Sequence, residues 1–168
     1  MTDYFERLGL PRRFSIDAAE VERRYLALSR ECHPDLQGDA SEAEQFAAIE
    51  QTASLNQAYT TLKDPFRRAE YLLHLSGGPT AGQEKSLDQS FLLEMMETRE
   101  RMDELRDAGG DLRELETDLE RQYNEILADV AGRFENSTDD LVMIRRRLNA
   151  AKTIQSLLRD LRGTPDLT

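Results

Sequence analysis

The sequence predicts an all-α protein made of two helical domains. Apolar residues recur at helical spacing along most of the chain, and the alternation typical of a half-buried strand is nearly absent. A segment rich in glycine and proline, residues 76–82, interrupts the helical pattern and marks a boundary. The 168 residues are enough for two small domains. We therefore expect one domain over residues 1–75, a linker over 76–87 and a second domain over 88–168.

The first domain begins with a short apolar element over residues 4–8, which ends at the turn-forming residues 9–11. The next helix is predicted to start at Asp17 and Glu20, which have the spacing of a capping box. Pro34 ends this helix, because the residue before a proline is pushed out of the helical region. The apolar residues of the helix share one face and are Val21, Tyr25, Leu28 and Cys32.

A second long helix is predicted from Ser41 and Glu44, another capping-box pair, to about residue 62. It is apolar on two sides, and a helix of this kind usually packs between neighbours. One side contains Phe46, Ile49 and Ala53, and the other contains Ala48, Leu55, Tyr59 and Leu62. Asp64 and Pro65 then have the pattern of an N-cap and a first helical residue, so they predict a short helix.

The second domain is predicted to be a three-helix bundle. Helical stretches over residues 88–108, 111–136 and 138–162 are separated by short loops, which favour antiparallel neighbours. The core stripe of the first of these helices consists of Phe91, Met95, Thr98, Met102 and Leu105. Leu92, Leu93 and Met96 are apolar residues beyond that stripe. They are typical of a protein-binding patch, but they also fit a wider core face or packing on the first domain.

Composition excludes several classes of partner and site. The formal net charge of −11 argues against duplex nucleic acid or an anionic membrane as a partner. A single cysteine, Cys32, excludes an internal disulfide, a four-cysteine zinc site and an iron–sulfur cage. No apolar run approaches the ~20 residues of a membrane span. The acidic N-terminus lacks the pattern of a secretion signal, so we expect a cytoplasmic protein.

An enzyme is the least favoured class. The sequence contains no nucleotide-binding loop, metal cluster or convincing acid–base pair, so we expect no catalytic residue, no cofactor and no metal. A catalytic triad of Cys32, His33 and Asp35 is disfavoured by geometry. Cys32 falls on the apolar face, and consecutive helix residues point about 100° apart.

The tripeptide His33-Pro34-Asp35 lies between the two long helices of the first domain, and the helix before it carries a basic stripe. Arg23, Ala27 and Arg30 recur at helical spacing, and both arginines lie opposite the apolar face. In the simplest alternative, the proline only ends a helix and the arginines are only solvated.

With these features, residues 1–75 resemble a J-domain, the module that docks on DnaK-class chaperones and triggers their ATP hydrolysis. In such a complex the Asp35 carboxylate takes an arginine of the chaperone, and the arginine stripe meets an acidic patch. The chaperone-binding residues that the resemblance implies are Arg23, Ala27, Arg30, His33, Pro34 and Asp35.

Further features resemble the HscB family, the J-domain co-chaperones of iron–sulfur cluster assembly. They are Asp3-Tyr4-Phe5, Gly9-Leu10-Pro11 and the Arg-Arg-Ala-Glu-Tyr-Leu-Leu run at residues 67–73, and the resemblance extends over essentially the whole chain. It implies an L-shaped two-domain molecule that brings an IscU-type scaffold to an HscA-type chaperone. The scaffold-binding residues that it implies are Leu92, Leu93, Met96, Glu97, Glu100 and Glu104.

The chain departs from the family pattern at two places. Cys32 stands where the family often has an aromatic residue. Residues 145–147 are three arginines on the last helix, where the family tends to place an aromatic residue, and we expect them to form a solvated face. We expect a monomer or a weak homodimer. Two alternatives remain open, namely a J-protein for a different client and a helical oligomer that uses the apolar patch on itself.

Overall fold

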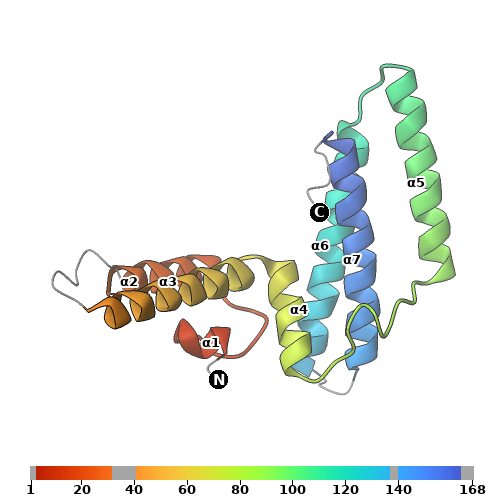
Figure 1. Cartoon of the computed structure of the whole chain (residues 1–168). Coiled ribbons are helices and arrows are strands. Elements are labelled where there is room, and N and C mark those ends of the chain that lie inside the picture. The colour runs from red at the N-terminus through yellow and green to blue at the C-terminus, as the bar shows by residue number, and fades with distance from the viewer. Residues whose placement is uncertain (1–2, 32–40, 137–139, 164–168) are drawn as a thin grey trace. The chain divides into compact units, whose positions relative to one another are not determined.

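The computed structural model describes residues 3–31, 41–136 and 140–163, and within these ranges all regular structure is helical. The chain divides into two compact units, Met1–Leu72 and Leu73–Thr168. This architecture confirms the predicted all-α fold class (Figure 1). The described helices are α1 (Tyr4–Arg7), α2 (Ala18–Glu31), α3 (Glu42–Lys63), α4 (Pro65–Leu75), α5 (Gln89–Asp107), α6 (Arg113–Asn136) and α7 (Leu141–Leu161).

In the first unit, α2 and α3 form a helical hairpin (Figure 1). Tyr25 of α2 stacks on Tyr59 of α3 with ring centroids 4.1 Å apart, and its hydroxyl donates to Asn56 Oδ1 at 2.9 Å. Val21 is fully buried, and Tyr25 and Leu28 are half-buried, so the predicted apolar face of α2 packs inward. Cys32, which was predicted on the same face, lies outside the described residues.

Capping contacts explain where the helices of the first unit begin. Ser41 and Glu44 form the predicted capping box of α3, and the Asp64 carboxylate accepts from the Arg67 amide at 2.8 Å in the first turn of α4. The start of α2 differs from the prediction. Asp17 accepts from the Ala19 amide at 3.0 Å, while the Glu20 carboxylate pairs with arginines one turn further along the helix.

The prediction that α3 packs on both sides is wrong. Phe46 and Ile49 are 62% and 60% exposed, and Ala53 is also exposed. The opposite side of α3 buries Ala48 and Leu55 against its neighbours. Within the described part of the unit, α1 and α2 are the helices in extensive contact with α3, and they leave the Phe46 side open.

The second unit contains α5, α6 and α7, which lie side by side with alternating directions (Figure 1). This arrangement is the predicted three-helix bundle. Its shared core contains residues from all three helices, namely Met95, Met102, Leu115, Leu119, Ile154, Leu157 and Leu158. Gly109, at a φ of +63°, makes the turn that follows α5.

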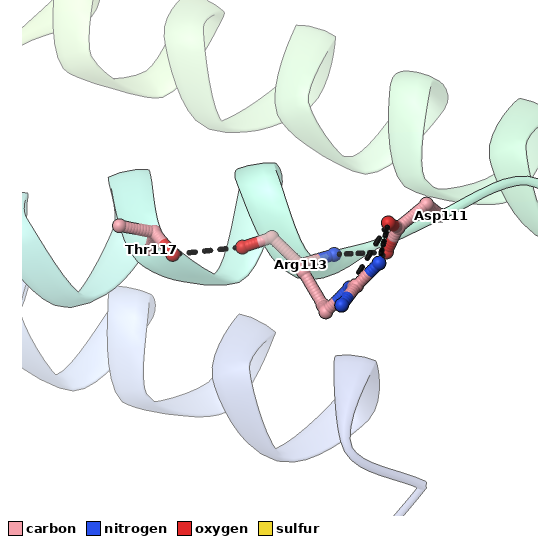
Figure 2. Close-up of polar contacts among 3 residues, drawn as sticks. All are labelled: Asp111, Arg113 and Thr117. Carbon is pink, nitrogen blue, oxygen red and sulfur yellow. Dashed lines mark hydrogen bonds and ion pairs between the residues drawn. The ribbon is translucent and has the colours of Figure 1, made fainter.

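A local network forms the start of α6 (Figure 2). The Asp111 carboxylate accepts from the Arg113 amide at 3.0 Å and from the Arg113 guanidinium at 2.7 Å. The side-chain hydrogen bond from Arg113 is the main reason why the pKa of Asp111 falls to about 2. One turn later the Thr117 hydroxyl donates to the Arg113 carbonyl at 2.8 Å.

The arginines at residues 145–147 do not form the solvated face that we predicted. Arg145 is buried, and its Nε donates to Asn149 Oδ1 at 3.0 Å. Arg146 pairs with Glu84 at 3.3 Å, and Arg147 pairs with Asp129 at 2.8 Å. Partners from α6 and from the segment before α5 hold these charges, so the cluster stabilises the second unit.

Among the described helices, none is long and apolar enough to cross a membrane.

Candidate functional site

The first candidate surface is the outer face of α2. Arg23, Ala27 and Arg30 are all exposed there, as the helical spacing predicted. The Arg23 guanidinium pairs with Glu20, yet its side chain remains 69% exposed. This face therefore offers positive charge and a small central residue to a partner. The other residues predicted for this surface, His33, Pro34 and Asp35, lie outside the described residues.

The inner face of α2 packs against α3, and this packing orients the outer face. Its Tyr25 is fixed by the stack on Tyr59 and by the hydrogen bond to Asn56. Lys63 donates to the Tyr59 hydroxyl at 2.7 Å, and this hydrogen bond raises the pKa of Lys63. These side-chain contacts fix how α2 packs on α3, and with it which face of α2 carries the exposed arginines.

Arg68 is a structural residue whose role sequence reasoning missed. Its guanidinium is buried and donates to the carbonyls of Phe14 and Leu62, both at 2.8 Å. Burial lowers the pKa of Arg68. Nearby, the Tyr71 hydroxyl accepts from the Tyr4 amide at 3.0 Å. The residue run 67–73 pointed to a family resemblance, but nothing in it identified Arg68 as the residue that joins the 14–16 loop to the end of α3.

The second candidate surface is the outer face of α5. Leu92, Leu93 and Met96 are 43%, 54% and 62% exposed, whereas Met95 and Met102 on the other side are buried. Glu97, Glu100 and Glu104 are exposed on the same helix. The three apolar residues therefore do not belong to the core of the second unit. They form an exposed patch that is bordered by carboxylates, as the sequence predicted.

A groove continues this patch toward α7. It has a volume of about 540 Å³, and its apolar lining includes Leu87, Leu92, Met95, Met96 and Leu157. Three cationic side chains, Lys85, Arg99 and Lys152, also line it. Sequence reasoning missed this groove because it joins residues from the predicted linker, α5 and α7. The one hint in the sequence is the scarcity of lysine: the chain has three lysines, and two of them line the groove.

The segment before α5 forms one wall of the groove because it is bound to α7. Asn149 Nδ2 donates to the Glu84 carbonyl at 3.0 Å, and the Glu84 carboxylate pairs with Arg146. Among the residues that the structure describes, no group of three or more metal-ligating side chains comes together.

Two family models match the two parts of the chain separately, and two solved structures match nearly the whole chain. Residues 3–71 match the DnaJ domain, and residues 87–161 match the HSCB C-terminal oligomerisation domain. The structure is similar to chaperone HscB from Vibrio cholerae, with a TM-score of 0.82, 32% identity and 96% of each chain covered. It is also similar to the human co-chaperone protein HscB, with a TM-score of 0.82 and 28% identity, over 96% of this chain and 81% of that chain.

Proposed function

The chain belongs to the HscB family of J-domain co-chaperones, and we propose that it delivers an IscU-type iron–sulfur scaffold to a DnaK-class chaperone of the HscA type. In this proposal the first unit stimulates ATP hydrolysis by the chaperone, and the second unit holds the scaffold. The observation that carries the proposal is the presence of two exposed surfaces of different chemistry, one basic on α2 and one apolar and acidic on α5.

The chaperone-binding surface combines the α2 face with the His33-Pro34-Asp35 tripeptide. Arg23 and Arg30 supply positive charge on a protein whose net charge is −11, so they attract an acidic patch and speed the encounter. The Asp35 carboxylate then forms a charge-assisted contact with an arginine of the chaperone. Pro34 restricts the backbone beside it. Binding of this surface shifts the chaperone toward its hydrolysing conformation.

The scaffold-binding surface is the exposed patch of α5. Leu92, Leu93 and Met96 provide an apolar centre, and Glu97, Glu100 and Glu104 provide a charged rim on the same helix. An apolar centre with a polar rim is the usual anatomy of a specific protein interface. Because one chain carries both surfaces, it raises the effective concentration of the scaffold at the chaperone.

A substitution at Asp35 tests the first half of this proposal. We expect Asp35→Asn to abolish stimulation of the chaperone's ATPase and to leave scaffold binding unchanged, because the amide loses the charge that attracts an arginine. Asp39→Asn, which removes a carboxylate nearby in the sequence, is the matched control and should behave as the wild type. Stimulation that survives in Asp35→Asn would show that the tripeptide does not have this role.

A pair of methionines tests the second half. Met96 is exposed and Met102 is buried on the same helix, so the two truncations separate binding from folding. Met96→Ala, combined with Leu93→Ala, should weaken scaffold binding and leave the melting temperature unchanged. Met102→Ala should lower stability by about 2–5 kcal/mol through lost burial and a cavity. A lowered melting temperature with unchanged binding in the Leu93/Met96 variant would place those residues in the core instead.

A further inference from the structure

We infer that Lys85 and Lys152 bind a carboxylate of the scaffold segment that occupies the groove between α5 and α7. This inference rests on the proposed function and deepens it, since it assigns the partner segment a composition and an orientation. The segment carries an apolar side chain for the groove and an acidic residue beside it. Both lysines line the groove together with Leu92 and Met96 of the apolar patch.

The shape of the groove fits an apolar anchor. Its volume of about 540 Å³ lies in the range of cavities that hold a bound ligand. Leu87, Leu92, Met96 and Leu157 line it, and the two exposed members of this set belong to the patch on α5. Methionine adapts its shape to a partner, so this lining is suited to an inserted aliphatic or aromatic side chain.

The charge on the groove is opposite to the charge of the whole chain. The net charge is −11, yet the groove is lined by three cations and by no carboxylate. Arg99 is held by Asp160 at 2.9 Å, so part of its charge is neutralised within the chain. Within the described residues, no carboxylate pairs with Lys85 or Lys152. These two ammonium groups are the ones available to a partner.

The acidic residue next to Lys85 is already engaged. The Glu84 carboxylate pairs with Arg146 at 3.3 Å and accepts from the Ser86 amide at 2.7 Å. The Glu84 carbonyl is held by Asn149 of α7. The backbone beside Lys85 is thereby fixed, and the nearest carboxylate in the sequence does not compete for its ammonium group. A carboxylate from outside the chain therefore meets two solvated cations beside the apolar lining of the groove.

The arrangement also sets the direction of the bound segment. The cations line the groove between α5 and α7, whereas a separate hollow between α5 and α6 is lined by three carboxylates and one cation, namely Glu94, Glu97, Asp118 and Arg101. A segment that crosses α5 thus meets positive charge at one end and negative charge at the other. The reversed orientation is disfavoured, because it would place the charges of the segment next to like charges of the chain.

Charge reversal of both lysines tests the inference. Lys85→Glu combined with Lys152→Glu should weaken scaffold binding at least roughly tenfold and flatten its salt dependence between about 50 and about 300 mM NaCl. The matched Lys85→Arg, Lys152→Arg variant should bind like the wild type, since it keeps the charge. Arg67→Glu combined with Arg121→Glu, at exposed sites on α4 and α6, makes the same change of net charge and should also bind normally.

The outcomes distinguish this inference from the function on which it rests. If the Leu93/Met96 variant loses binding while the glutamate variant keeps it, the lysine contact is wrong and the proposed function stands. If the wild type does not bind the scaffold at all, both are overturned. Normal folding of the glutamate variant, checked by circular dichroism, is required for either conclusion.

A zero-length cross-link provides an independent readout. A carbodiimide activates a carboxylate, the lysine Nζ displaces the activating group to form an amide, and the carbodiimide leaves as a urea. We expect peptides of Lys85 or Lys152 joined to an aspartate or glutamate of the scaffold, and no such product at Lys63, the third lysine. Products between two copies of this chain at these lysines, or scaffold products at Lys63 alone, contradict the inference.

Discussion

The side-chain amide of Asn149 on α7 donates to the backbone carbonyl of Glu84 at 3.0 Å, and its oxygen accepts from the buried Arg145. One residue thus joins the segment before α5 to α7 and accepts a hydrogen bond from a buried guanidinium. We expect Asn149→Ala to lower the free energy of unfolding by about 1–3 kcal/mol, because the Glu84 carbonyl and the Arg145 Nε each lose a hydrogen bond. Urea unfolding followed by circular dichroism measures this. Asn124→Ala, at an exposed site on α6, should change stability little.

Arg68 and Arg67 are neighbours in sequence with opposite environments. Arg68 is buried and donates to two carbonyls, while Arg67 is exposed. We expect Arg68→Met to lower the free energy of unfolding by about 2–4 kcal/mol, since the carbonyls of Phe14 and Leu62 lose their donor. Arg67→Met serves as the control. Equal effects of the two substitutions on urea unfolding would contradict the structural role of Arg68.

The basic face of α2 should control the rate of association with the chaperone. Arg23→Glu combined with Arg30→Glu is expected to slow association roughly tenfold at low salt, with a smaller difference at high salt where charges are screened. Stopped-flow or biosensor kinetics measure these rates. Arg13→Glu combined with Arg121→Glu makes the same change of net charge at two exposed arginines outside this face and should leave the rate near the wild-type value. An equal decrease of the association rate in both variants would show that net charge alone controls association.

The network at the start of α6 should be visible in an acid titration. The pKa of Asp111 is about 2 in the folded protein and 3.8 in the reference state. Because the folded pKa is depressed, the stabilising contribution is complete above the reference pKa and disappears as the pH falls through the folded pKa. Carboxyl chemical shifts measured by NMR should therefore show a midpoint near the lower value. Arg113→Gln should raise the midpoint toward the reference value.

Local sequence signals predicted the helices well because capping is a local property. Ser41 with Glu44 and Asp64 before Pro65 mark helix starts through contacts that span three residues. Exposure on one helix was also predictable, as Met95 and Met96 of α5 illustrate by facing opposite environments. The periodic pattern alone decides on which side of a helix such residues lie.

The sequence-based predictions of burial were wrong where burial depends on which helices and side chains pack against a residue. Phe46 and Ile49 have the pattern of a packed face, but the described helices of the first unit leave that face uncovered. Arg145 has the pattern of a surface residue, but it is buried beside Asn149. The groove combines Lys85 and Lys152 from segments far apart in sequence, and no local rule brings them together.

The most direct test of the account is the steady-state ATP turnover of the cognate DnaK-class chaperone, measured with this protein and the scaffold added separately and together. We expect modest stimulation by each alone and a much larger rate with both, because one chain binds both partners and raises their local concentration. Stimulation by this protein that the scaffold does not increase would contradict scaffold delivery. No stimulation by this protein, with or without the scaffold, would contradict the account as a whole.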